Sequence, residues 1–181
     1  PGNQDFFLSK YEKYISPVAD TFCYCLMPNH FHFLIRIKSE KELISAFPKF
    51  ETLEKLISKR FSNFFSSYSQ AYNKQQGRMG SLFMKNFKRK KITDEIYLKK
   101  LVHYIHFNPI EAGLCKSPEQ WEYSSYSSLL ANKSGLLKTE EVTEWFGDKE
   151  NFIYVHQYPS ELDFSFSKVS NFGKATPKLK S

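Results

Sequence analysis

The chain has 181 residues, a formal net charge of +7 and an aromatic content of 17%. This length fits one domain, or one domain with an appendage, and is enough to bury a sizeable core. No apolar run approaches the ~20 residues of a membrane-spanning helix, and the N-terminal stretch lacks the basic and apolar regions of a signal peptide. We therefore expect a globular cytoplasmic protein that does not bind membranes. Positive charge with many aromatic rings favours nucleic-acid binding, although proteins without that function also show it.

The apolar pattern predicts helices and one β-hairpin. In chain order we expect a helix over 3–15, strands over 20–27 and 30–38, helices over 52–75 and 94–107, and short helices near 139–146 and 149–157. A turn at Pro28-Asn29 should join the two strands. Asn108-Pro109 should end the helix expected over 94–107. The segment 81–92 fits either a strand or a loop, and 159–181 shows little pattern. A hairpin flanked by helices predicts an α+β fold.

Two histidines lie one residue apart in the second expected strand. Side chains alternate between the faces of a strand, so His30 and His32 share one face while Phe31 and Phe33 share the other. We expect helices to pack on the phenylalanine face and to leave the imidazoles together on the opposite face. Such a pair can bind one metal ion, but it can also be two ordinary polar side chains.

Cys23 and Cys25 give a second interpretation of the histidine pair. With His30 and His32 they form the pattern C-x-C-x4-H-x-H, which has the residue types of a structural zinc site. The cysteines are closer in sequence than zinc sites usually have them. Cys115 is the third cysteine, and an odd number with two neighbours on one strand does not predict a disulfide framework.

Tyr104 and Asn108 are four residues apart on the helix expected over 94–107, so they share one face. A tyrosine on an amphipathic helix is by itself more often a core residue than a nucleophile. The pair "MPNHFHFLI" and "YIHFNPIEAGL", however, resembles the HUH superfamily of single-tyrosine transposases. Within it the likeness is to the REP-associated tyrosine transposases, which are relatives of the small insertion-sequence transposases.

Three further segments match that family's pattern in order, and the likeness runs from about Tyr24 to Leu129. They are "GRMGSLFMKNFKRKKI", "DEIYLKKLVHYIHFNP" and "WEYSSYSSL". The resemblance implies a ferredoxin-like antiparallel sheet with helices packed on one face. The transposase domain would span 1–130, and 131–181 would form a C-terminal extension of short helices and tail. The family's strand before the first helix has no counterpart at the start of this sequence, and 39–51 has little family character.

The resemblance also assigns roles to the matching residues. Tyr104 would be the nucleophile, and His30, His32 and Asn108 would bind a divalent metal, Mg²⁺ or Mn²⁺. Attack by the tyrosine on single-stranded DNA would leave a 5′-phosphotyrosine and a free 3′-hydroxyl. The implied function is a metal-dependent single-stranded DNA endonuclease and strand transferase that needs no nucleotide cofactor.

The segment 74–91 is the expected DNA contact. It has no acidic residue, and its phenylalanines alternate with basic residues. Positive charge can follow the DNA backbone while rings stack on bases, although a solvated basic loop would look the same. The candidate DNA-binding residues are Arg78, Lys85, Phe87, Lys88, Arg89, Lys90 and Lys91. The resemblance implies hairpin DNA with short single-stranded flanks as the substrate.

Two other functions compete with the transposase. One is a non-catalytic DNA-binding protein on the same fold, against which the presence of both histidines, Tyr104 and Asn108 argues. The other is a replication-initiator or relaxase nuclease, which shares the histidine pair but occurs in larger chains. We expect a monomer, as in the REP-associated branch, with a homodimer that exchanges tyrosine helices as the alternative.

Overall fold

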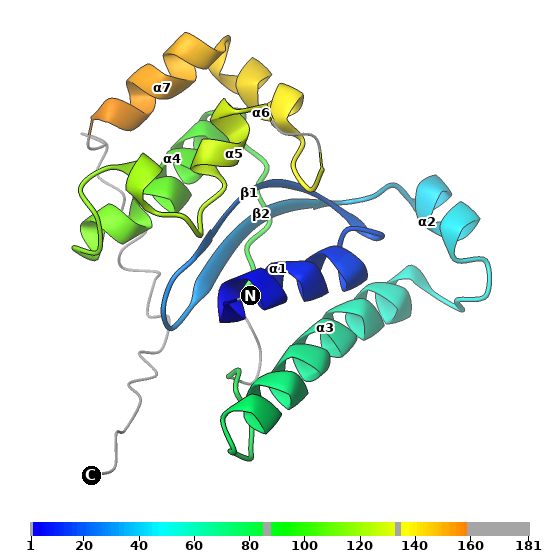
Figure 1. Ribbon diagram of the computed structural model, residues 1–181. Coiled ribbons are helices and arrows are strands. Elements are labelled where there is room, and N and C mark those ends of the chain that lie inside the picture. The colour runs from blue at the N-terminus through cyan, green and yellow to red at the C-terminus, as the bar shows by residue number, and fades with distance from the viewer. Residues whose placement is uncertain (1, 85–87, 133–134, 159–181) are drawn as a thin grey trace. The chain divides into compact units, whose positions relative to one another are not determined.

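The computed structural model of the chain describes residues 2–84, 88–132 and 135–158. Within these ranges it contains seven α-helices, one short 3-10 helix and one two-stranded antiparallel sheet, which agrees with the expected α+β class (Figure 1). The elements are α1 (Asn3–Tyr14), β1 (Ala19–Leu26), β2 (Phe31–Ile37), α2 (Glu40–Ala46), α3 (Leu53–Gln75), α4 (Glu95–Glu111), the 3-10 helix η1 (Pro118–Gln120), α5 (Tyr126–Leu130), α6 (Thr139–Phe146) and α7 (Lys149–Gln157). No helix in the described ranges has both the length and the apolar character needed to cross a membrane.

The chain forms two compact units. The first, here the α3 unit, comprises Pro1–Thr21 and Ile35–Arg89, and the second, the α4 unit, comprises Phe22–Leu34 and Lys90–Ser181. The α3 unit is held together largely by aromatic rings between α1 and α3. Phe7 on α1 contacts Phe64 and Tyr68 on α3 edge to face, with ring centroids 4.9 Å and 5.0 Å apart. Such pairs stabilise a helix packing beyond the burial of their apolar area.

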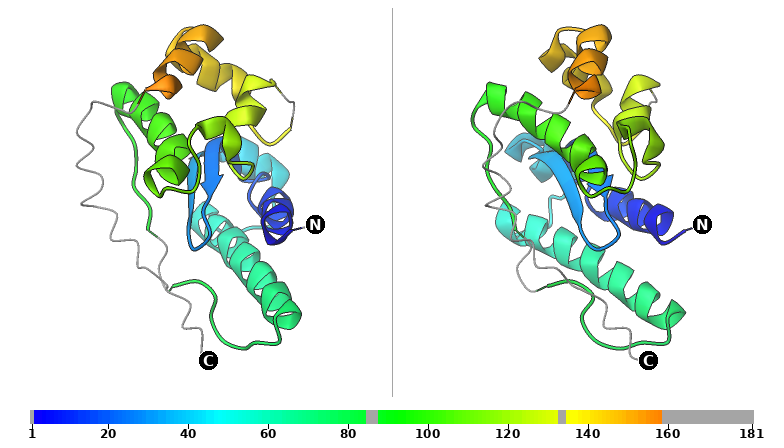
Figure 2. Two further views of the ribbon diagram at one scale, coloured as in Figure 1. Left: turned by 60° about the vertical axis from the view of Figure 1, so that its left-hand side comes forward. Right: turned by 90° about the vertical axis from the view of Figure 1, so that its left-hand side faces the viewer.

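The core of the α4 unit lies where α4 packs on the tip of the β-hairpin (Figures 1 and 2). Val102 and Ile105 of α4 are buried there together with Leu34 of β2. The two C-terminal helices α6 and α7 supply Val142, Phe146 and Phe152 to the same core. The residues beyond 130 therefore help to hold α4, the helix that carries Tyr104.

The hairpin is closed by a hydrogen bond from the Met27 N–H to the His30 carbonyl, at 2.8 Å. Counting back from this pair sets Tyr24 opposite Phe33, and the two rings stack with centroids 5.5 Å apart. The same register sets Cys25 opposite His32. These two side chains share one face of the sheet, and Tyr24 and Phe33 share the other.

α4 covers the histidine face, so the expectation that the histidines lie on a face left uncovered by helices is wrong. The reason is Leu34, which shares the face of His32 and is 6% exposed within the core. β2 therefore presents both His32 and the buried Leu34 to α4. Its outer residue Ile37, in contrast, is 38% exposed.

The start of α4 agrees with the sequence, because the Asp94 side chain accepts a hydrogen bond from the Ile96 N–H at 2.9 Å. The predicted end at Asn108-Pro109 is wrong, because α4 continues to Glu111 with Pro109 inside it. Proline removes one backbone donor near the end of the helix, where the remaining bonds still hold the turn.

Gly113 terminates α4 instead. It has φ +69°, its N–H donates to the Ile110 carbonyl, and the Leu114 N–H donates to the Pro109 carbonyl, both at 2.9 Å. This is a Schellman motif, in which glycine takes the left-handed conformation without steric cost. As a result Asn108 remains helical and stays one turn above Tyr104.

The remaining predictions differ in outcome. The helices expected near 139–146 and 149–157 are confirmed as α6 and α7. The helix α2 was not predicted, and the residues 81–84 and 88–92 form no strand. The stretch "WEYSSYSSL" is partly regular, because α5 begins at Tyr126 and Cys25 pairs with Ser124 in an antiparallel bridge that covers the edge of β1.

Candidate active site

Tyr104 and the two histidines lie together in the α4 unit. The ring centroids of His32 and Tyr104 are 5.7 Å apart, with the ring planes at 71°. The rings of His30 and His32 are 5.0 Å apart and nearly perpendicular. The histidines come from the hairpin and the tyrosine from α4, and all three side chains are half-buried. Three of the four predicted active-site residues are thus neighbours in space.

Asn108 is the fourth, and it lies one turn beyond Tyr104 on α4. Its side-chain Nδ2 donates to the Tyr104 carbonyl at 3.0 Å, and the residue is 9% exposed. An amide has one donor end and one acceptor end, so this bond fixes the nitrogen and leaves Oδ1 as the end that can act as an acceptor or a ligand.

The histidines are held in the neutral form. Burial lowers the pKa of His32 to about 4, and repulsion from His30 adds to this effect, whereas hydrogen bonding with Asn108 opposes it. Burial also lowers the pKa of His30, again against hydrogen bonding with Asn108. A metal ion binds an imidazole only through an unprotonated nitrogen. Both side chains therefore have the protonation state that a ligand requires at neutral pH.

Asn29 orients His30. The His30 Nδ1 lies 2.6 Å from Oδ1 of Asn29, and because an amide oxygen only accepts, Nδ1 carries the hydrogen. The Nε2 of neutral His30 then holds the lone pair. A polar neighbour that fixes the tautomer in this way is a usual companion of a metal-binding histidine.

The zinc interpretation of the cysteines is not supported. Cys23 and Cys25 are fully buried in the core of the α4 unit. Burial raises the pKa of the Cys25 thiol to about 12 and raises that of Cys23 as well, which disfavours the thiolate form that zinc binds. In the described ranges no three or more His, Cys, Asp and Glu side chains form a group that could hold a metal ion. Asn108, which hydrogen-bonds with both histidines, is the candidate for a third protein ligand at the histidine pair.

The candidate DNA-binding residues divide between the two units. Arg78, Lys88 and Arg89 belong to the α3 unit and Lys90 and Lys91 to the α4 unit, and all five are exposed. Lys85 and Phe87 lie outside the described residues.

Lys90 connects the basic segment to α4. Its Nζ donates to the Tyr97 hydroxyl at 3.1 Å and lies 4.8 Å from the centre of that ring. Tyr97 is seven residues before Tyr104, which is about 10 Å along one face of the helix. A cation and a ring therefore lie about two turns before Tyr104 along α4.

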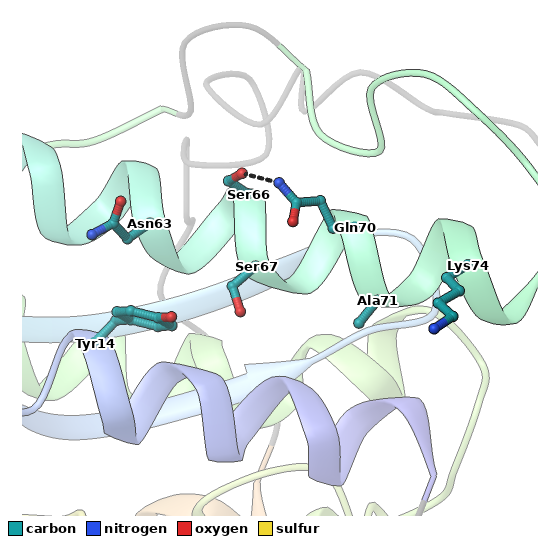
Figure 3. Close-up of a pocket in the computed structure, with 7 residues that line it drawn as sticks. All are labelled: Tyr14, Asn63, Ser66, Ser67, Gln70, Ala71 and Lys74. Carbon is teal, nitrogen blue, oxygen red and sulfur yellow. Dashed lines mark hydrogen bonds between the residues drawn. The ribbon is translucent and has the colours of Figure 1, made fainter.

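The α3 unit contains a polar hollow of about 550 Å³ between α1 and α3 (Figure 3). Tyr14 of α1 lines it together with Asn63, Ser66, Ser67, Gln70, Ala71 and Lys74 of α3. None of the predicted active-site residues is part of it.

The sequence did not point to three buried histidines in the α4 unit. His103, His106 and His156 have exposed fractions of 4%, 0% and 2%. His103 and His106 lie within the motif that contains Tyr104, but His156 is 50 residues further along the chain. No signal in the sequence links it to them.

Comparisons of the chain with protein-family models, with curated proteins and with solved structures found no match. The motifs and the geometry of the α4 unit are therefore the features of this chain that bear on its function.

Proposed function

We propose that the protein is a metal-dependent single-stranded DNA endonuclease and strand transferase, a transposase, with Tyr104 as its nucleophile. One observation carries the proposal: the ring of Tyr104 lies 5.7 Å from that of His32, although the two residues are 72 positions apart in sequence and on different elements. A structural role for Tyr104 would not require a half-buried phenol beside two neutral imidazoles.

The side chains around Tyr104 fit a divalent metal. His30 and His32 are neutral, and Asn108 supplies an amide oxygen whose partner nitrogen is already bonded. Mg²⁺ and Mn²⁺ accept oxygen ligands readily and keep open positions for phosphate oxygens. A bound metal would act as a Lewis acid toward the scissile phosphate and orient it for in-line attack.

Tyr104 would form the covalent link. Its Oη would bond to the phosphorus, the bond from phosphorus to the 3′-oxygen would break, and the phenolic proton would pass by way of solvent to the leaving 3′-oxygen. The product is a 5′-phosphotyrosine and a free 3′-hydroxyl, and reversal of the step rejoins the strand. A covalent intermediate of this kind divides one difficult transfer into two easier ones.

Single-stranded or hairpin DNA is the proposed substrate. The support is the run of exposed cations that includes Lys88, Arg89 and Lys91, together with the contact of Lys90 with Tyr97. Cations that follow a phosphate backbone and rings that stack on bases bind single strands with little sequence preference.

We further propose a ferredoxin-like fold for the region that contains the hairpin, α1 and α4, with the monomer as the active form. Tyr104 lies beside the histidine pair of its own chain, so the group needs no tyrosine helix from a second copy. We also propose a cytoplasmic location.

The proposal is tested by covalent trapping. Wild-type protein with Mn²⁺ and an end-labelled hairpin oligonucleotide should give a labelled, protease-sensitive adduct that survives denaturing electrophoresis. Tyr104→Phe should give no adduct and should still bind the oligonucleotide. Tyr154→Phe is the matched control, because it makes the same change at an exposed tyrosine on α7 that has no part in the proposed site.

An adduct in Tyr104→Phe would overturn the assignment of the nucleophile. A wild-type protein that binds the oligonucleotide without forming an adduct would favour the non-catalytic DNA-binding protein.

A further inference from the structure

The back of α4, opposite Tyr104, is bonded to its surroundings through His106. His106 is two residues after Tyr104, so it points about 200° away from it around the helix. It is fully buried and makes two hydrogen-bond contacts: its Nδ1 lies 3.0 Å from Nε2 of His156, and its Nε2 lies 2.8 Å from Oγ of Ser125. These contacts tie α4 to α7 on one side and to the residue before α5 on the other.

The direction of each bond follows from the groups at the ends. His156 Nδ1 lies 2.8 Å from the Phe152 carbonyl, which only accepts, so Nδ1 carries the hydrogen. The Nε2 of neutral His156 is then an acceptor, and His106 Nδ1–H donates to it. The Nε2 of His106 is in turn an acceptor. The Ser125 hydroxyl has one hydrogen and two acceptors in reach, His106 Nε2 at 2.8 Å and the Tyr24 carbonyl at 3.1 Å, and the unprotonated Nε2 takes it. Neutral imidazoles therefore satisfy every nitrogen of both rings.

Ser125 in turn links α4 to β1 through hydrogen bonds with Tyr24. Its Oγ accepts the N–H of Tyr24 at 2.8 Å, and its own backbone N–H donates to the Tyr24 carbonyl at 2.9 Å. Tyr24 is in the middle of β1, and β1 pairs with β2, which carries His32. A continuous path of hydrogen bonds thus runs from the back of α4 to the hairpin whose histidines face the front of α4.

We propose that His106 and Ser125 are positioning residues that fix the rotation of α4 relative to the hairpin and thereby hold Tyr104 beside His32. A helix with side chains has a radius of about 6 Å, so a rotation by ~10° moves a side-chain end by about 1 Å. A misplacement of this size can reduce a rate by ~100-fold. Apolar packing alone fixes rotation less sharply, because it has no direction.

The catalytic part of this inference rests on the proposed function, whereas its structural part does not. The structural test is an NMR measurement of the nuclear Overhauser effect between the rings of His32 and Tyr104. We expect the effect in the wild type and in Ser127→Ala, where the serine is exposed on α5. We expect it to be weakened or lost in Ser125→Ala, which makes the same change two residues earlier.

The catalytic test is the rate of adduct formation at saturating oligonucleotide. Ser125→Ala and His106→Leu should be ~100-fold slower than wild type, with an oligonucleotide Kd within about twofold. His106→Gln should recover most of the rate, since its amide can donate to His156 and accept from Ser125. A purely structural role would instead lower the folded fraction, and Kd and the rate would change together.

A wild-type ring contact and a wild-type rate in folded Ser125→Ala would overturn the positioning role. If the wild type forms no adduct, the proposed function is wrong, and the NMR comparison of Ser125→Ala with Ser127→Ala still decides whether the two residues position α4. If His106→Leu does not fold, Ser125→Ala provides both measurements.

Discussion

The α4 unit contains two groups of histidines that differ in what surrounds them. His106 and His156 are enclosed, and backbone or side-chain groups of the protein occupy the nitrogens of both rings. His30 and His32 are half-buried and lie beside Tyr104 and Asn108. The same residue type therefore joins elements in one case and lies in the proposed active site in the other. Substitutions of His30 and of His156 should therefore differ, with His30 affecting mainly the adduct rate and His156 mainly stability.

The largest expected effect is on catalysis. His30→Asn should reduce the rate of adduct formation at least ~1,000-fold, because the proposed function makes His30 a metal ligand and its loss would remove several kcal/mol of transition-state stabilisation. Its free energy of unfolding should change by less than about 1 kcal/mol, as is usual for a side chain that is not enclosed. Adduct rates and urea titrations on the same sample measure both quantities. An unchanged rate would remove His30 from the site.

His156→Leu should show the reverse pattern. It leaves the His106 N–H without its acceptor in a dry core, and a buried donor without a partner costs about 1–3 kcal/mol. Urea unfolding should show that loss, while the adduct rate at low temperature should fall less than tenfold because Ser125 still links His106 to β1. A loss of activity as large as in His30→Asn would mean that the two groups are not separate.

The pH dependence of stability sharpens the comparison further. Burial lowers the pKa of His156 to about 3 and that of His106 well below its usual range. Above pH 6.5 neither the folded nor the unfolded chain protonates these residues, and their contribution is complete. As the pH falls below 6.5, His106 and His156 bind protons in the unfolded chain but not in the folded chain. The folded chain therefore loses stability toward pH 4.

The expected slope is up to about 1.4 kcal/mol per pH unit for each proton taken up. Urea titrations between pH 7 and pH 4 measure it, and His156→Leu should give a shallower slope than wild type. Equal slopes would show that His156 does not determine the acid sensitivity.

The smallest expected effect is at the basic segment. Lys90→Ala should weaken binding of the hairpin oligonucleotide about 3- to 10-fold and reduce the slope of log Kd against log salt by about 1, because one phosphate contact is lost. Lys149→Ala on α7 is a control with the same change of charge, and it should alter neither quantity. Equal effects of the two substitutions would mean that net charge, and not the basic segment, determines the affinity.

Local signals account for the parts of the fold that the sequence predicted. The apolar spacing predicted α3, α6 and α7, and the turn at Pro28-Asn29 predicted the hairpin. The helix α2 was missed although it has a local signal, a capping box in which Ser39 and Glu42 bond to each other's backbone N–H. The end of α4 was missed because an Asn-Pro pair favours a helix end, whereas here Pro109 is accommodated within the helix and Gly113 caps it.

The candidate site was predicted only in part, because its geometry depends on long-range packing. The motifs identified His30, His32, Tyr104 and Asn108, which the fold brings together. The alternation of side chains along β2 shows which residues share a face, but not which face α4 covers. That depends on the packing of Leu34 with residues of α4. The bond between His106 and His156 joins positions 50 residues apart, and no spacing rule predicts such a pair.

The measurement that tests the central claim most directly is the location of the covalent link. The adduct of wild-type protein with a short oligonucleotide is digested with a protease, and the peptide that carries the nucleotide is sequenced by mass spectrometry. The chain has 11 tyrosines, and the account predicts that Tyr104 alone carries the nucleotide and that His30→Asn carries none. A nucleotide on another tyrosine, or equal labelling in His30→Asn, would contradict it.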